Sequence, residues 1–164
     1  MKLLTFAVPC YNSEAYMENC IRSLLPGGED VEIIIVDDGS KDGTAAIADR
    51  YAAEYPTIIK AVHQENGGHG EGVNQGLRHA SGLFYKVVDS DDRLDPAALE
   101  KLLCRMREHI AENKMVDMYV CNYVYDHWDG SERKVMRYNN VFPEEKIVTW
   151  NDTRRFLVTQ YLMM

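Results

Sequence analysis

Residues 31–40 read VEIIIVDDGS, and this stretch indicates the fold more clearly than any other part of the chain. Its first six residues form a short, nearly continuous apolar run, which is typical of a strand buried on both faces in a parallel sheet. Two acids and a Gly-Ser turn signal follow at once. Similar apolar runs lie at residues 3–8, 58–62 and 83–88, so we expect four such strands.

Helical patterns separate these runs. In three segments the apolar residues recur at helical spacing, and the third segment begins with the N-cap signal Asp95-Pro96. Strands that alternate with helices indicate βαβ units with right-handed crossovers. The sequence therefore predicts an α/β fold with a Rossmann-like, mostly parallel sheet flanked by helices. The three apolar faces comprise Met17, Cys20, Ile21 and Leu24; Ile47, Ala48, Tyr51, Ala52 and Tyr55; and Leu99, Leu102, Leu103, Met106 and Ile110.

The pattern changes after residue 116. Residues 118–125 predict a longer strand, Asp129-Gly130 predicts a hairpin turn, and residues 133–138 predict a returning strand. A helix is expected from Asn151, with Phe156, Leu157 and Tyr161 on one side. This segment also contains a series of aromatic residues, Tyr119, Tyr123, Tyr125 and Trp128. Their alternation favours strand packing over a sugar-binding platform.

Length and charge limit the possible functions. The chain has 164 residues, which suits one α/β domain with a real core. Its formal net charge is −8 and its pI is about 5.1, which argues against nucleic acid or an anionic membrane as a partner. An acidic protein can still bind a phosphate-rich ligand when a divalent cation bridges the two.

The cysteines indicate a reducing compartment rather than a metal site. They form no Cys-x-x-Cys pair, which argues against zinc, and each lies in an apolar run, where a free thiol behaves as a small hydrophobe. We therefore expect a cytoplasmic protein. The apolar run at residues 3–8 is too short for a secretion signal or a membrane span. The four cysteines are Cys10, Cys20, Cys104 and Cys121.

Polar residues follow each of the four apolar runs. The carboxyl ends of parallel strands meet at one edge of a sheet, where α/β proteins bind ligands next to the point at which the strand order reverses. Four polar clusters at one edge therefore predict a binding site. The clusters are PCYN at residues 9–12, DDGS at 37–40, NGGHG at 66–70 and DSDD at 89–92.

The DSDD cluster indicates metal or ligand binding. Three carboxylates within four residues raise one another's pKa unless a cation neutralises them. Hard divalent ions prefer oxygen ligands, and Mg²⁺ is commonly held by one or two carboxylates together with substrate phosphates. The alternative is that these acids only stabilise the N-terminus of the next helix, although Asp95 already supplies a cap there.

The other clusters leave alternatives open. DDGSKDGT at residues 37–44 fits ordinary turn and N-cap chemistry as well as it fits hydrogen bonds to a ribose or a base. Tyr11 could be a core residue or could stack on a base. The glycines after Asn66 let the backbone approach a ligand closely, but no P-loop Lys-Ser/Thr ending is present. His69, in this glycine-rich loop, could contact a phosphate or be solvated, and the sequence favours neither.

Together, and in this order, the clusters resemble glycosyltransferase family 2, an inverting family with the GT-A fold. The resemblance rests on Pro9, Tyr11 and Asn12; on residues 37–40 and 42–44; on Asn66 to Gly68 and Asn74 to Gly76; and on Asp89 to Asp92. It covers about the first two-thirds of the chain. It implies a single GT-A-type domain over residues 1–164, in which 1–112 form the nucleotide-sugar-binding half and 113–164 begin an incomplete acceptor-side half.

The resemblance also implies roles for individual residues. Pro9, Tyr11 and Asp38 would contact base and ribose with support from Asp37, and Asn66 and Gly68 would belong to the same donor site. Asp91 would act in catalysis as a metal or ribose ligand. The other acids of the cluster, Asp89 and Asp92, would share in binding the diphosphate and a Mg²⁺ or Mn²⁺ ion.

Two departures from the family pattern stand out. Family members often carry Arg immediately before the Asn of Asn-x-Gly, where this chain has Val73. The general base of the family is an Asp or Glu well downstream of the acid cluster, and Asp126 and Asp129 lie too close to the predicted hairpin turn to serve. We therefore expect a piece of a longer protein, which the apolar end Met163-Met164 also suggests.

The function expected from the resemblance is metal-dependent transfer of a sugar, with inversion, from a nucleotide diphosphate sugar to an acceptor hydroxyl. UDP-sugar is the preferred donor, and the acceptor is a saccharide or a lipid-linked molecule. Membrane association would occur at the cytoplasmic face, through further sequence. The alternatives are a sugar-phosphate nucleotidyltransferase, a non-catalytic nucleotide- or metal-binding module, and a receiver-type signalling domain.

Overall fold

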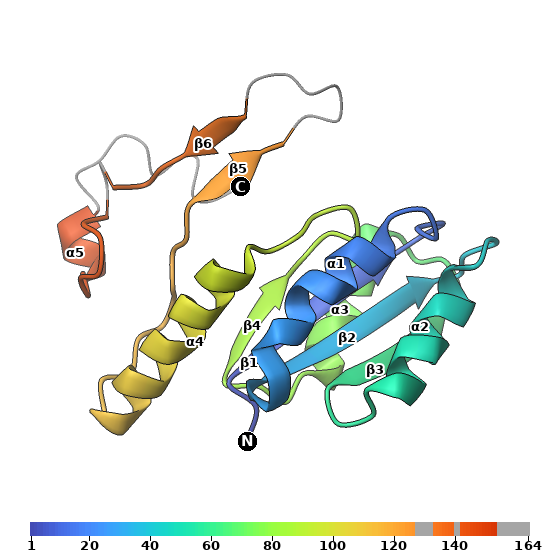
Figure 1. Ribbon diagram of the computed structural model, residues 1–164, viewed down its shortest axis with the longest axis horizontal. Coiled ribbons are helices and arrows are strands. Elements are labelled where there is room, and N and C mark those ends of the chain that lie inside the picture. The colour runs from blue at the N-terminus through green and yellow to red at the C-terminus, as the bar shows by residue number, and fades with distance from the viewer. Residues whose placement is uncertain (127–132, 140–141, 154–164) are drawn as a thin grey trace. The chain divides into compact units, whose positions relative to one another are not determined.

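The computed structural model describes residues 1–126, 133–139 and 142–153 (Figure 1). The chain divides into two compact units, Met1–Glu112 and Asn113–Met164. The first unit contains every residue expected in the donor site.

A four-stranded parallel sheet forms the centre of the first unit. Its strands are β1 (Leu4–Cys10), β2 (Val31–Asp38), β3 (Ile59–Gln64) and β4 (Phe84–Val87), in the order β3-β2-β1-β4. The predicted α/β class and the four predicted strands are confirmed. The expectation that all four are buried on both faces is wrong for β3 and β4, which are partly exposed because they form the edges of the sheet.

Helices cover both faces of this sheet (Figure 1). In Figure 1, α1 (Met17–Leu24) and α2 (Thr44–Glu54) lie in front of the sheet, and α3 (His69–His79) lies behind β1 and β2. The chain moves from β1 through β2 to β3 in one direction, and α3 then carries it back to β4 on the far side of β1. The strand order thus reverses between β1 and β4, the position at which α/β sheets bind ligands.

The core lies between these layers. β1 and β2 are buried along their whole length, and α1 packs one fully buried apolar face against them. On the other face α3 approaches β1 so closely that a Cβ at Gly76 would lie 2.4 Å from the Cβ of Ala7. The predicted apolar faces are largely confirmed, and Tyr55 follows the end of α2 rather than lying within it. The buried residues of the predicted apolar faces are Met17, Cys20, Ile21, Leu24, Ala48, Tyr51, Leu99, Leu103 and Met106.

A buried carboxylate ties the amino-terminal edge of the sheet together. Glu32 in β2 is 3% exposed. Its Oε2 accepts hydrogen bonds from Thr5 Oγ1 in β1 at 2.9 Å and from the Ser81 N–H at 2.8 Å. Its Oε1 accepts hydrogen bonds from Lys60 Nζ in β3 at 2.6 Å and from Ser81 Oγ at 3.0 Å. One side chain therefore joins three strands to the segment that leads into β4.

The helix after the acid cluster starts as predicted. The Asp95 side chain caps α4 (Pro96–Ala111) by accepting a hydrogen bond from the Ala98 N–H at 2.8 Å. This helix packs against α1 and the short 3₁₀ helix η1 (Leu25–Asp30). Because Asp95 provides the cap, the acids that precede it are free for another role.

The second unit contains the antiparallel pair β5 (Tyr123–Tyr125) and β6 (Lys134–Met136) and the short helix α5 (Trp150–Thr153). The expected strands are confirmed in pairing but are shorter than predicted, because only three residue pairs form a ladder among the described residues. Tyr123 and Tyr125 lie in β5 as expected, and their rings meet edge to face with centroids 5.2 Å apart, although the two residues are 41% and 50% exposed. The predictions for Trp128, Asp129-Gly130, Phe156, Leu157, Tyr161 and Met163-Met164 lie outside the described residues.

The described part of the chain contains no helix long and apolar enough to cross a membrane.

The cysteines fall into two groups. Cys10 and Cys20 are buried and free, as expected for small hydrophobic residues, and burial is the main reason that the pKa of each thiol is raised to about 12. The expectation of an apolar setting is wrong for Cys104 and Cys121, which are exposed. Cys104 lies on the outer side of α4, and Cys121 lies outside the short ladder of the second unit.

Candidate functional site

A pocket of about 330 Å³ opens at the carboxyl-terminal edge of the sheet in the first unit. Residues from β1, from the end of β2 and from the start of α3 line it, so three of the four predicted polar clusters meet there. Tyr11 is 47% exposed, so it is not a core residue and its ring remains accessible to a ligand. The lining residues are Pro9, Cys10, Tyr11, Asp38, Asn66, Gly68, His69 and Gly72.

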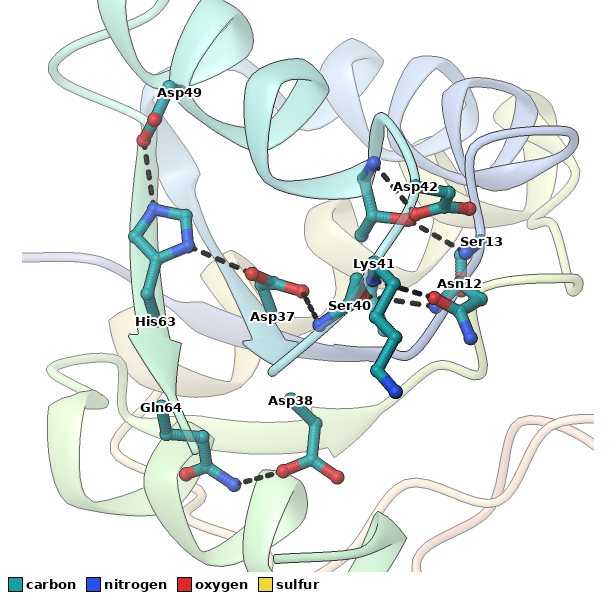
Figure 2. Close-up of polar contacts among 12 residues, drawn as sticks. Asn12, Ser13, Asp37, Asp38, Ser40, Lys41, Asp42, Asp49, His63 and Gln64 are labelled. Carbon is teal, nitrogen blue, oxygen red and sulfur yellow. Dashed lines mark hydrogen bonds and ion pairs between the residues drawn. The ribbon is translucent and has the colours of Figure 1, made fainter. Parts of the chain in front are cut away.

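The two acids at the end of β2 point to opposite faces of the sheet, because successive side chains of a strand alternate. β3 pairs with β2 so that Asp37 lies opposite His63 and Asp38 lies opposite Gln64. Each acid therefore meets a polar partner from β3 on its own face of the sheet. Figure 2 shows these two cross-strand pairs.

Asp38 holds the glycine-rich loop that forms one wall of the pocket. Its Oδ1 accepts hydrogen bonds from Gln64 Nε2 at 2.5 Å and from the Gly67 N–H at 2.7 Å, and its Oδ2 accepts from the Gly68 N–H at 2.8 Å. Burial opposes the charge of this carboxylate, but these hydrogen bonds outweigh it and lower the pKa of Asp38. A carboxylate offers about four acceptor positions, so one remains for a ligand.

On the other face, Asp37 forms the middle of a polar chain (Figure 2). Its Oδ1 accepts a hydrogen bond from the Ser40 N–H at 3.1 Å, and its Oδ2 lies 3.1 Å from His63 Nδ1. His63 Nε2 lies 2.9 Å from Asp49 Oδ1 in α2. The hydrogen bond to Asp49 raises the pKa of His63 most, partial burial opposes it, and Asp37 raises it further. Asp37 thus supports the turn after β2 and is 4% exposed.

The loops after β1 and β2 are fastened to each other. Asn12 donates its N–H to Ser40 Oγ at 3.0 Å and accepts the Lys41 N–H at its Oδ1 at 2.8 Å (Figure 2). Asp42 accepts hydrogen bonds from the N–H groups of Thr44, at 3.0 Å, and Glu14, at 3.2 Å. The turn chemistry considered for residues 37–44 is therefore confirmed for Asp37 and Asp42, whereas Asp38 faces the pocket.

The acid cluster forms the loop after β4, and its carboxylates lie at the surface. Asp89, Asp91 and Asp92 are exposed, whereas Ser90 between them is 8% exposed. Partial desolvation raises the pKa of Asp92 most, and the charges of Asp91 and Asp89 raise it further. Over the described parts of the chain, no group of three or more His, Cys, Asp or Glu side chains is arranged to hold a metal ion.

His69 connects the pocket with the acid loop. It is the first residue of α3 and lines the pocket, and its Nε2 lies 3.7 Å from Asp89 Oδ1. It is the one residue among those lining the pocket whose side chain can carry a positive charge. The structure thus places His69 between the pocket and the acid loop, the two parts of the predicted site.

Sequence reasoning missed the buried polar residues that position the loops. Gln64 orients Asp38, and Ser13 bonds Ser90 across 77 residues of sequence. The one signal in the sequence was the position of these residues, since Gln64 ends the third strand and Ser90 lies inside the acid cluster. Nothing local indicates that Ser13 and Ser90 meet, because their contact depends on β1 and β4 being neighbours.

The fold and the site together define an α/β protein with a pocket at the carboxyl-terminal edge of a parallel sheet. The family model of glycosyl transferase family 2 matches residues 5–164, and the chain belongs to this family. The parallel sheet flanked by helices is that of glycosyltransferases with the GT-A fold, as expected.

Three similar proteins illustrate this relationship. The putative glycosyltransferase EpsH of Bacillus subtilis is 36% identical over 127 residues, which cover 77% of this chain and 35% of EpsH. The crystal structure of S. aureus TarS residues 1–349 in complex with UDP is 33% identical, with a TM-score of 0.58 over 67% of this chain and 33% of that chain.

The mannosyltransferase PcManGT from Pyrobaculum calidifontis, in complex with GDP-Man and Mn²⁺, is 28% identical, with a TM-score of 0.51 over 55% of this chain and 28% of that chain. The chain therefore spans about a third of the length of the proteins it matches.

Proposed function

We propose that this chain is the donor-binding part of a glycosyltransferase that moves a sugar, with inversion, from a nucleotide diphosphate sugar to an acceptor hydroxyl. One observation carries the proposal: Tyr11, Asp38 and the glycine-rich loop line one pocket, and His69 joins that pocket to the acid loop. The acceptor would be a saccharide or a lipid-linked molecule, and the assignment of residues 1–164 to one domain remains part of the proposal.

The nucleotide part of the donor fits the pocket. The exposed ring of Tyr11 offers a stacking surface for a base, and Asp38 retains an acceptor position for a base N–H. Pro9, Asn66 and Gly68 would complete this contact, with Asp37 supporting the turn beside it. TarS has been solved with UDP and with UDP-GlcNAc, and PcManGT with GDP-Man. We favour a UDP-sugar, since the family pattern leans toward uridine and uracil carries one such N–H.

The acid loop suits a divalent cation, Mg²⁺ or Mn²⁺. Its donor atoms are hard carboxylate oxygens. Desolvation raises the pKa of Asp92 most, the charges of Asp91 and Asp89 raise it further, and a cation would offset both effects. Asp91 would be the central ligand, with Asp89 and Asp92 sharing the ion, and the donor's phosphates would supply the remaining oxygens. When bound, the ion supplies Lewis-acid stabilisation of the charge on the leaving diphosphate.

Other residues of the chain orient the donor. His69 can hydrogen-bond a phosphate oxygen from the edge of the pocket, and the glycine-rich loop lets the backbone approach the ligand. We assign no general base. The Asp126 carboxylate bonds Arg133 Nε at 2.9 Å and lies in the second unit, which does not favour it as the group that deprotonates the acceptor. We place the reaction in the cytoplasm, because both buried cysteines are free.

Calorimetry tests the proposal. UDP, GDP, dTDP and CMP are titrated into the native chain with and without Mn²⁺, and we expect UDP to bind at least about tenfold more tightly with the ion. In Asp91→Ala this gain should fall to about twofold or less, since the central ligand is missing. Asp95→Asn is the matched control, because it removes a neighbouring charge while asparagine still caps α4. If no nucleotide binds in a Mn²⁺-dependent manner, the proposal is wrong.

A further inference from the structure

The acid loop at residues 89–92 and the loop after β1 are joined inside the protein by two hydroxyl groups, those of Ser90 and Ser13. We infer that Ser13 is a positioning residue whose hydroxyl, through Ser90, sets the place of the acid loop relative to the nucleotide pocket. This inference rests on the proposed function, because it assigns Ser13 a role in metal-dependent donor binding.

The contact is buried and links distant parts of the chain. Ser13 is 0% exposed and Ser90 is 8% exposed, and their Oγ atoms lie 3.0 Å apart. Ser13 Oγ also accepts the N–H of Tyr11 at 3.2 Å, and the Ser13 N–H donates to Thr44 Oγ1 at 2.7 Å. A single serine therefore connects the backbone of the proposed base-stacking residue, the start of α2 and the middle of the acid loop.

The acid loop has separate attachments at its two ends. The Cys20 thiol contacts the Asp89 carbonyl oxygen at 3.6 Å, and the Leu94 N–H donates to Ser23 Oγ at 3.0 Å. Removing the Ser13–Ser90 hydrogen bond therefore leaves the ends of the loop in place and loosens its middle, where Ser90 keeps its contact with the Cys10 thiol. The middle is the part that carries Asp91, the residue proposed to ligate the cation.

This arrangement predicts a defect confined to the metal-dependent step. A shift of about 1 Å in a binding or catalytic group can cost up to about a hundredfold, so small loop displacements are measurable. In Ser90→Ala the nucleoside pocket keeps its supports, because Ser13 still accepts the Tyr11 N–H, Asp38 still holds the glycine-rich loop and Asn12 still holds the turn after β2. Loss of the Ser90 hydroxyl should therefore affect the diphosphate and cation while sparing the nucleoside, whereas Ser13→Ala also removes the acceptor of the Tyr11 N–H.

The test is a double-mutant cycle on the whole chain with Ser13→Ala, Ser90→Ala and the double variant. Calorimetry measures UDP affinity with and without Mn²⁺ and uridine affinity alone, and the EPR signal of free Mn²⁺ measures ion binding with UDP present. We expect the Mn²⁺-dependent gain in UDP affinity to fall about three- to tenfold in each single variant, because one hydrogen bond represents a factor of that size. The double variant should lose no more of the gain than the worse single variant, and in Ser90→Ala uridine affinity should stay within about twofold.

Thr5→Val is the matched control, because it removes a buried hydroxyl at the opposite edge of the sheet and should leave the Mn²⁺-dependent gain unchanged. If Ser13→Ala does not fold, Ser90→Ala carries the test, since Ser90 lies in a loop. Single effects that add in the double variant, equal losses for UDP and uridine in Ser90→Ala, or an unchanged gain would each contradict the inference. A native chain without any Mn²⁺-dependent gain would instead overturn the proposed function, and this inference with it.

Discussion

Replacing Asp38 with alanine is expected to weaken UDP binding by roughly 30-fold or more, a factor that corresponds to about 2 kcal/mol. Two losses combine in this variant. The acceptor position proposed for the base disappears, and the N–H groups of Gly67 and Gly68 lose the carboxylate that holds them. The glycine-rich loop must then be ordered when the nucleotide binds, which adds to the cost of binding.

Two measurements separate these losses. Amide hydrogen exchange should show Gly67 and Gly68 less protected in Asp38→Ala, and calorimetry should show weaker UDP binding with and without Mn²⁺. Asp38→Asn should also be impaired, because one side-chain oxygen becomes an N–H₂ group that faces a hydrogen-bond donor. Asp30→Asn is the control, since Asp30 bonds Arg107 in an ion pair away from the pocket. Unchanged UDP affinity together with unchanged glycine protection in Asp38→Ala would show that Asp38 does not organise the pocket.

The second large effect concerns stability. Glu32→Ala is expected to lower the free energy of unfolding by about 3 kcal/mol, because the buried hydroxyl of Thr5 and the Ser81 N–H lose their acceptor. Urea denaturation followed by circular dichroism measures this change. Glu29→Gln is the control, because Glu29 pairs with Lys2 at the surface and its removal should have little effect.

The effect of Glu32 should depend on pH in a defined direction. Burial raises the pKa of this carboxyl, but the hydrogen bonds from Lys60, Ser81 and Thr5 outweigh it and hold the pKa below its ordinary value of 4.5. The stabilisation is therefore fully present above about pH 4.5 and is lost as the pH falls through the lower folded-state value. The difference between native chain and Glu32→Ala should shrink over that acidic range. A difference that stays constant or grows there would contradict this assignment.

The fold of the first unit could be predicted because its local signals agree. Apolar runs, helical faces and the cap at Asp95 all indicated the same βαβ order, and the structure has it. Edge exposure could not be predicted, because whether β3 lies inside or at the edge of a sheet depends on strand order. The strand expected at residues 118–125 is short, because only residues 123–125 of this segment pair with β6. An alternating sequence pattern indicates a strand but does not show which of its residues have a neighbouring strand to pair with.

The location of the pocket could be predicted from the sequence, but most of the contacts within it could not. The polar clusters after the strands indicated the edge of the sheet at which the pocket opens, and five of the residues expected to bind the donor line this pocket. The dual position of Asp38 could not be read from the motif, because it depends on the register that sets Gln64 beside it. The acids at residues 89–92 stay a prediction for metal binding, since a cation held partly by substrate oxygens requires the substrate. The five expected residues that line the pocket are Pro9, Tyr11, Asp38, Asn66 and Gly68.

A crystal structure of the chain with UDP and Mn²⁺ is the most direct measurement of how the two loops act together. We expect the uracil ring against Tyr11 with its N–H at Asp38, and Mn²⁺ between the diphosphate and the Asp91 carboxylate. Manganese bound away from residues 89–92, or UDP bound away from this edge of the sheet, would contradict the assignment of both loops to one donor site.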